Sequence, residues 1–167
     1  MQRIHQANTD GHTDHIQKLL GEYLEGVCSG LNRQFDAGLD HKSILEQDMA
    51  GLDRVSAPYG CLLLAEVDGQ MAGIACLQKI GAGIGEVTRM YVRPAFRRRG
   101  IARELLEHLI QEARQIEYAT IRLDTARSSP AHLLYHAAGF REIERYSESE
   151  IPQDLQSMAV YMEMTLR

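Results

Sequence analysis

One segment near the middle of the chain constrains the fold more than any other. Residues 86–92 are rich in β-branched and aromatic residues, and residues 101–116 follow with apolar side chains at helical spacing. Apolar Ile121 and Leu123 then alternate with polar residues, which predicts a strand over residues 120–125. A strand, a helix and a strand in this order form a βαβ unit with parallel strands. The segment therefore predicts the α/β class.

The rest of the chain predicts antiparallel strands beside this unit. Residues 61–67 and 70–80 both have strand composition, and Asp68-Gly69 between them is typical of a two-residue hairpin turn. Glycines at 81, 83 and 85 predict a further turn before residues 86–92. Other strands are expected at 1–7, 140–146 and 158–166, and other helices at 14–28, 42–53 and 130–138. The predicted architecture is one domain over residues 1–167, with a mixed, mostly antiparallel central sheet and flanking helices.

Composition excludes several classes of protein. A chain of 167 residues with 44% hydrophobic and 25% charged residues is typical of one globular domain. The net charge of −5 opposes binding to nucleic acid. No apolar run approaches the ~20 residues of a membrane helix, and the first residues lack the apolar core of a signal peptide, so a cytoplasmic location is expected. The three cysteines lack metal-site spacing and are predicted to be reduced packing residues.

The link between residues 86–92 and the helix at 101–116 is strongly basic. It reads Arg97-Arg98-Arg99-Gly100, and Gly100 lets the backbone approach a ligand closely. The first N–H groups of a helix have no internal partner and carry the positive end of its dipole. This turn is therefore predicted to bind an anion such as a phosphate. The alternative is that the three arginines only form a solvated turn.

Two motifs in this order resemble a known family. Residues 97–102 read Arg-Arg-Arg-Gly-Ile-Ala and resemble the acyl-CoA signature of the GNAT N-acetyltransferases, in which Gln or Arg is followed by two residues, Gly, one residue, and Gly or Ala. Residues 134–140 read LYHAAGF and resemble the LYxxxGF-like segment of the family. The order of elements extends the resemblance over essentially the whole chain, although residues 1–60 match only in type of structure. The resemblance implies a GNAT-like acyl-CoA N-acyltransferase fold that uses acetyl-CoA as cosubstrate and no metal.

The resemblance also implies where acetyl-CoA is held. The strands at 86–92 and 120–125 are expected to splay apart, so that the backbone of one strand binds the pantetheine arm while the basic turn binds the pyrophosphate. Many relatives carry an asparagine early in the last helix, where this chain offers Ser128, Ser129 or His132 instead. The cofactor-binding residues implied in this way are Met90, Tyr91, Val92, Arg97, Arg98, Arg99, Gly100, Ile101, Ala102, Ser128, His132 and Tyr135.

Two catalytic residues follow from the same resemblance. A lysine-like amine has a pKa of about 10.4 and arrives protonated, so a base must remove a proton before attack. Glu86 matches a family glutamate that acts through water; the alternative is a strand-edge carboxylate, exposed or paired with Arg89. Tyr135 matches a family tyrosine that donates a proton to the departing CoA thiolate. The alternative there is an aromatic ring that only fills space between helix and sheet.

The acceptor is the least determined part of the prediction. A small-molecule amine or an amino-acid-like acceptor is expected, because no extended basic or aromatic docking surface is evident, and neither nucleic acid nor membrane is an expected partner. His132 and His136 are four residues apart, but no third ligand is visible, so no metal site is predicted. A homodimer is a family-level expectation. The alternative function is a non-catalytic acyl-CoA-binding sensor or interaction module, from which amine-dependent release of CoA would distinguish an enzyme.

Overall fold

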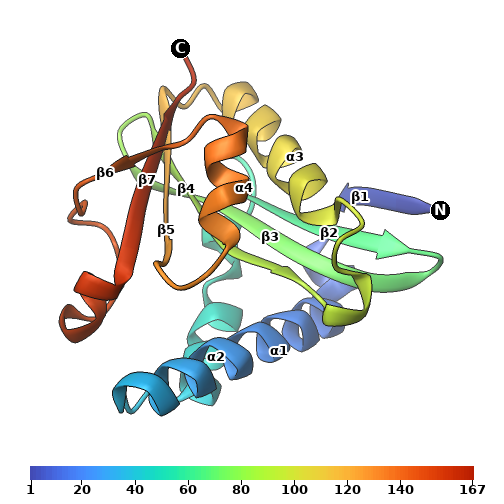
Figure 1. Ribbon diagram of the computed structural model, residues 1–167. Helices are drawn as coiled ribbons and strands as arrows, with labels where there is room; N and C mark the ends of the chain where they lie inside the picture. The colour runs from blue at the N-terminus through green and yellow to red at the C-terminus, as the bar shows by residue number, and fades with distance from the viewer.

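The centre of the molecule is a seven-stranded sheet, shown in Figure 1. The computed structural model covers residues 1–167. The strands lie in the order β1-β2-β3-β4-β5-β7-β6, and every neighbouring pair is antiparallel except β4 and β5. This confirms the predicted mixed, mostly antiparallel sheet. The strands are β1 (Gln2–Gln6), β2 (Cys61–Val67), β3 (Gln70–Gly81), β4 (Ile84–Val92), β5 (Thr120–Ala126), β6 (Arg141–Ile143) and β7 (Ala159–Thr165).

Helices cover both faces of the sheet. In Figure 1, α1 and α2 lie against one face, and α3 and α4 lie against the other. No helix combines the length and the apolar content that crossing a bilayer requires. The α-helices are α1 (Thr9–Phe35), α2 (His41–Ala50), α3 (Ile101–Gln115) and α4 (Ala131–Ala138), and the short 3-10 helices are η1 (Leu52–Val55), η2 (Pro94–Phe96) and η3 (Gln153–Met158).

Two apolar layers hold these helices to the sheet. On one side, Ile16 and Leu19 of α1 are fully buried with Leu64 of β2. On the other side, Leu105 and Leu109 of α3 are fully buried in a larger cluster that includes residues of β2, β3, β4, β5 and β7. Each helix contributes residues at helical spacing to its layer, as the periodicity predicts. All three cysteines are free and buried in these layers or beside them, which confirms their predicted packing role.

Strands β4 and β5 share only the first part of their length. Residues 84–86 pair with residues 120–122 in parallel register, and from Val87 onward β4 has no partner on that edge. On its other edge β4 stays paired with β3, apart from a bulge around Arg89, whose φ is +54°. Strand β5 remains paired with β7 along its full length. The two strands therefore diverge, as predicted, and leave an open backbone edge between them.

Several predicted boundaries are wrong by a few residues or more. Helix α1 is longer than the predicted 14–28, because Asn8 caps it by accepting a hydrogen bond from the Asp10 N–H and the helix continues to Phe35. Val27 of this helix is 39% exposed although it is apolar, whereas Leu24 and Cys28 beside it are buried. Strand β6 has three residues and does not reach Tyr146.

The layer under α3 generates a stability prediction. Leu109→Ala leaves a cavity in a fully buried site, so we expect the free energy of unfolding to fall by about 2–5 kcal/mol. Urea denaturation followed by circular dichroism measures this change. Glu107→Ala, on the exposed face of the same helix, is the control and should change stability by less than about 0.5 kcal/mol. Equal effects of the two substitutions would contradict the packing described.

Candidate functional site

The turn that leads from η2 into α3 has an open backbone with two left-handed residues. Arg98 and Gly100 have left-handed φ angles of +62° and +80°, so successive backbone amides curve around one point. The first helix amide with a backbone partner is that of Glu104, which donates to the Gly100 carbonyl. The N–H groups before it are the ones that a helix leaves without internal partners. No heavy atom lies within 4 Å of the position of a Cβ on Gly100, so a ligand can approach the backbone.

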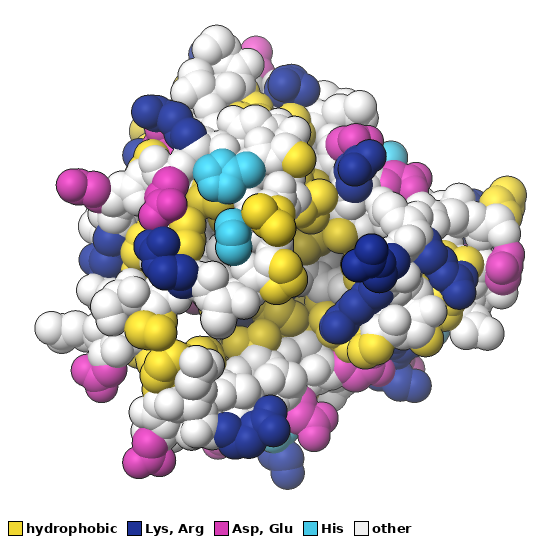
Figure 2. Space-filling model, viewed as in Figure 1, with side chains coloured by type: hydrophobic (Ala, Val, Ile, Leu, Met, Phe, Trp, Pro, Cys, Tyr) yellow, Lys and Arg dark blue, Asp and Glu magenta, His cyan; other side chains and the backbone are white.

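The arginines of this turn have different environments. Arg97 Nε donates to the Val92 carbonyl at 2.9 Å and so ties the turn to the end of β4. The guanidinium of Arg99 lies 5.5 Å from the centre of the Phe96 ring. Arg98 forms no salt bridge in the structure. Figure 2 shows basic side chains and the histidines over α4 on opposite sides of a hollow that exposes apolar side chains. The turn therefore adds positive charge to one rim of this hollow.

The predicted contacts on β4 divide between its two faces. Met90 packs against the cluster under α3, and Val92 is buried in that cluster. The Tyr91 side chain lies on the opposite face, where its hydroxyl donates to Glu22 at 3.3 Å and its ring lies 5.9 Å from that of Tyr23. Any contact of Tyr91 with a ligand on the α3 side would therefore come from its backbone. Met90 and Val92 lie on the part of β4 that has no β5 partner.

The predicted residues near α4 surround the other side of the gap. His132 Nδ1 lies 2.6 Å from the Ser129 carbonyl oxygen, and Ser128 is exposed. Tyr135 is buried in the cluster under α3, with its ring 5.9 Å from that of Phe140. Its hydroxyl has no hydrogen-bond partner within the protein, and burial, with Tyr23 and Asp124 nearby, raises its pKa. Tyr135 is therefore a neutral phenol with a free hydroxyl proton.

Glu86 is neither surface-exposed nor paired with Arg89. Its side chain is 6% exposed, and each of its oxygens receives one hydrogen bond: Oε1 from Gln78 Nε2 at 2.9 Å, and Oε2 from the Tyr146 hydroxyl at 2.8 Å. Burial raises the pKa of Glu86, although these two donors oppose the shift by stabilising the ionised form. A buried carboxyl with a raised pKa can take up a proton more readily than an exposed one.

A second carboxyl lies beside Glu86. Asp124 Oδ2, on β5, accepts a hydrogen bond from Ser149 Oγ at 2.9 Å and lies 3.4 Å from the Tyr146 hydroxyl. Burial is the largest cause that raises the pKa of Asp124. Tyr146 thus stands between the two carboxyl groups, on the segment that connects β6 to η3. The two acids and this tyrosine come from three separate parts of the chain.

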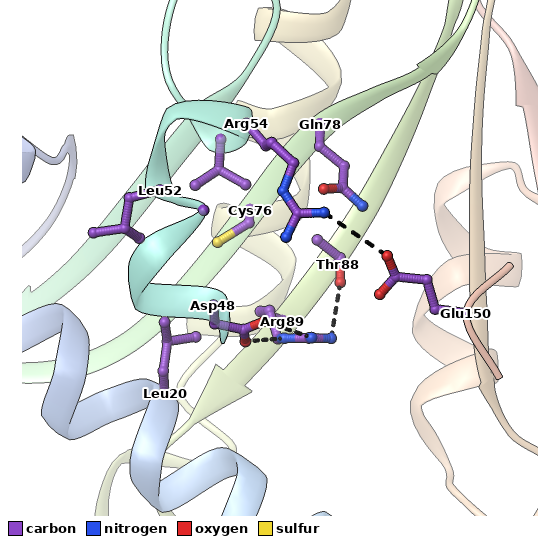
Figure 3. Close-up of a pocket in the computed structure, with 11 residues that line it drawn as sticks. Leu20, Asp48, Leu52, Arg54, Cys76, Gln78, Thr88, Arg89 and Glu150 are labelled. Atoms are coloured by element: carbon purple, nitrogen blue, oxygen red, sulfur yellow. Dashed lines mark hydrogen bonds and ion pairs between the residues drawn. The ribbon is translucent and has the colours of Figure 1, made fainter. Parts of the chain in front are cut away.

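A pocket lies next to Glu86, between the end of α2, η1 and strands β3 and β4. Gln78, the partner of Glu86, lines it together with Thr88, Arg89, Asp48 and Arg54. Figure 3 shows Arg89 directed at Asp48 at the base of this pocket, through hydrogen bonds of 2.6 and 3.0 Å. Arg54 projects across the pocket toward Glu150, 3.9 Å away. The pocket therefore combines charges of both signs.

The sequence did not predict four polar residues around Glu86 and its pocket: Asp48, Asp124, Tyr146 and Ser149. Asp124 could have been found, because it alternates with Ile121 and Leu123 and must therefore project from the opposite face of β5. Asp48 lies on α2 at a polar position of the helix pattern and carries no motif. Tyr146 and Ser149 lie in an irregular segment without periodicity, and nothing in the sequence signals their contacts. No cluster of three or more histidine, cysteine or acidic side chains is arranged to hold a metal ion.

Comparison with known proteins agrees with this geometry. The sequence model of the acetyltransferase (GNAT) family matches residues 24–140. The chain belongs to the GNAT family. A GNAT chain of this kind is an acyltransferase, which confirms the enzyme class and the fold expected from residues 97–102 and 134–140.

Acetyltransferases are found among the relatives of similar sequence and among the solved structures of similar shape. An uncharacterised N-acetyltransferase of Schizosaccharomyces pombe is 27% identical over 92% of this chain and 88% of its own. The N-acetylaspartate synthetase of Danio rerio is 33% identical over 65% of this chain, which spans 40% of that protein. A crystal structure of an acetyltransferase from Salmonella typhimurium with acetyl-CoA has a TM-score of 0.71 at 19% identity, over 100% of this chain and 95% of the other. The structural likeness shows that the GNAT fold is shared.

The buried carboxyl of Glu86 generates a pH-dependent stability prediction. Because its pKa is raised on folding, Glu86 favours the folded state while protonated, and this contribution is lost as the pH rises through the raised pKa. Glu86→Gln keeps the shape and cannot ionise. We expect its unfolding free energy, relative to the wild type, to increase between pH 4 and pH 8. Urea unfolding at a series of pH values measures this difference.

Glu107→Gln, on the exposed face of α3, controls for the chemical change itself. A difference between Glu86→Gln and wild type that is the same at every pH would contradict the burial of an ionisable Glu86.

Proposed function

We propose that the protein transfers an acetyl group from acetyl-CoA to a primary amine of a small molecule or an amino-acid-like acceptor, by direct attack in a ternary complex. The observation that carries the proposal is the divergence of β4 and β5. The turn proposed to bind the pyrophosphate follows the free end of β4, and a buried carboxyl, Glu86, lies at the point where the strands separate. A linear donor and an amine can therefore meet between the strands.

The residues on the donor side fit coenzyme A. The curved amides around Gly100 suit a pyrophosphate, and Arg98 and Arg99 add positive charge beside them. The unpaired edge of β4 at Met90 and Val92 offers backbone groups to the amides of the pantetheine arm. Ser128 and His132, near the start of α4, lie on the other side of the gap between β4 and β5. The acetyl-CoA in the Salmonella typhimurium structure of the same fold supports this donor.

Glu86 is the proposed base. The acceptor amine is mostly protonated at neutral pH, and attack on the thioester requires its lone pair. With a raised pKa, Glu86 is better matched to this task than an exposed glutamate, because a base works best when its pKa lies near the operating pH. Its 6% exposure means that the amine proton reaches it through a water molecule.

Tyr135 is the proposed acid for the leaving group. After the amine nitrogen bonds to the acetyl carbon, the carbon–sulfur bond breaks and the thiolate takes the hydroxyl proton of Tyr135. The proton that the nitrogen then loses restores the phenol. Burial keeps Tyr135 neutral before this step, and its hydroxyl has no competing partner within the protein.

The acceptor is proposed to bind in the pocket beside Glu86. Arg54 and Glu150 at its mouth are both more than half exposed and lie 3.9 Å apart, so this ion pair gives way easily to a substrate. The pocket thus offers a guanidinium to a carboxylate and a carboxylate to an ammonium. This fits an amino-acid-like acceptor. The name of the Danio rerio relative, N-acetylaspartate synthetase, also points to acetylation of an amino acid.

Binding of acetyl-CoA tests the donor site. Calorimetric titration of the wild type is expected to show micromolar affinity, which Gly100→Glu abolishes because its carboxylate repels the pyrophosphate. Gly38→Glu is the matched control, since Gly38 also has a left-handed φ of +65° and open space around it. Loss of binding in both variants, or in neither, would contradict the assignment of the turn.

Turnover tests the role of Tyr135. We expect Tyr135→Phe to lower kcat by about 10- to 100-fold, within the range that general acid catalysis supplies, while the affinity for acetyl-CoA stays nearly unchanged. The measurement is amine-dependent release of CoA thiol across a panel of amino acids and simple amines. An unchanged kcat would remove Tyr135 from the mechanism, and CoA release that no amine accelerates would favour a binding module over an enzyme.

A further inference from the structure

Tyr146 connects the proposed base to a carboxyl group that no step above uses. Its hydroxyl lies 2.8 Å from Glu86 Oε2 and 3.4 Å from Asp124 Oδ2. On the basis of the proposed function, we infer that Glu86, Tyr146 and Asp124 accept the proton of the acceptor amine as one unit. In this unit Glu86 is the base, Asp124 is a second proton acceptor, and Tyr146 is the positioning residue that joins them.

The distances indicate the resting arrangement. A tyrosine hydroxyl carries one proton and can donate only one strong hydrogen bond. The shorter contact shows that this proton is directed to Glu86, while Asp124 is held in place by Ser149 Oγ at 2.9 Å. The Tyr146 ring is itself fixed by Tyr161, whose ring meets it edge to face with centroids 5.8 Å apart. Because the Tyr146 hydroxyl acts as the donor in its contact with Glu86, its oxygen keeps lone pairs that can accept a proton from Glu86.

Proton transfer along this chain is balanced at every atom. When the amine loses its proton, an N–H bond breaks and an O–H bond forms on Glu86. Once Glu86 is protonated, the Tyr146 hydroxyl turns its own proton from Glu86 to Asp124. Glu86 can then give its proton to the Tyr146 oxygen while the original hydroxyl proton of Tyr146 moves to Asp124. Glu86 returns to its ionised form, Tyr146 stays neutral, and Asp124 holds the proton. Burial and the two neighbouring carboxyl groups raise the pKa of Tyr146, so the paired transfer is favoured over one that leaves a phenolate.

The charges around the unit favour proton uptake. Burial raises the pKa of both carboxyls, and Glu150 raises both further. Each carboxylate also disfavours ionisation of the other, so the first proton taken up belongs to the pair.

Two cations face the unit, and each already has a carboxylate partner. Arg89 is bound by Asp48 at 2.6 Å, and Arg122, 5.5 Å from the centre of the Tyr146 ring, is bound by Glu163 at 2.9 Å. Arg89 lowers the pKa of Asp124, but burial outweighs this effect. The unit therefore keeps an affinity for one proton.

Two substitutions distinguish this arrangement from a merely structural one, because they act on Glu86 in opposite directions. Tyr146→Phe removes a donor that stabilises ionised Glu86, so the acidic limb of the kcat/KM profile should move to higher pH. Asp124→Asn removes a neighbouring negative charge, so the limb should move to lower pH. Each should also lower kcat/KM at its optimum by about 10-fold, as expected for the partial loss of a base.

The profiles are measured with one acceptor throughout, so that the pKa of its amine is common to all variants. Tyr161→Phe is the matched control, because it removes a buried hydroxyl that has no hydrogen-bond partner. Its limb should stay at the wild-type pH. Limbs that shift in the same direction for Tyr146→Phe and Asp124→Asn, or that do not shift, would overturn the inference.

An infrared titration makes the test independent of turnover. The absorption of protonated carboxyl groups is followed against pH in the unliganded proteins, with Glu86→Gln identifying the Glu86 band. The midpoint of that band should rise in Tyr146→Phe and fall in Asp124→Asn. If no amine accelerates CoA release by the wild type, the proposed function fails, and these midpoints still decide whether the three residues titrate as one unit. Unmoved midpoints overturn the inference even in an active enzyme.

Discussion

The short contact between β4 and β5 is the constraint on which the rest of the structure depends. Two parallel strands that paired along their full length would leave no free backbone edge, and the sheet would be continuous. Here the ladder stops after residues 84–86, while β3 continues to support β4 and β7 continues to support β5. Each of the two strands therefore stays hydrogen-bonded to its outer neighbour where they separate, and apolar layers on both faces hold the helices to the sheet.

Hydrogen bonds explain how two acidic groups can be buried beside this opening. A carboxylate removed from water is costly unless hydrogen bonds replace those of the solvent. Gln78 supplies such a bond to Glu86 from β3, and Tyr146 and Ser149 supply bonds to Glu86 and Asp124 from the segment between β6 and η3. The compensation is incomplete, which is why the pKa of each acid is raised. Stability and reactivity thus have one physical origin at this site.

Local patterns predicted much of the fold, and they identified some members of the candidate site but not others. Cys61–Val67 forms a strand with the predicted bounds, and the turn at Asp68-Gly69 has left-handed φ angles of +49° and +80° at its two residues, because composition and turn chemistry act locally. The turn before α3 was also readable as a motif. The contacts of Tyr146 were not, because its segment follows a three-residue strand and acquires its place only through packing against β5 and β7.

The pocket beside Glu86 and the donor turn are contributed by different stretches of the chain. Its walls come from α1, the end of α2, η1, β3, residues 88–89 of β4 and Glu150, whereas the donor turn belongs to the link between β4 and α3. Substitutions in one stretch need not disturb the other. With the acceptor and the donor bound as proposed, selection can change which amine is acetylated while the donor site is inherited unaltered. Such modularity gives one scaffold a simple route to many physiological roles.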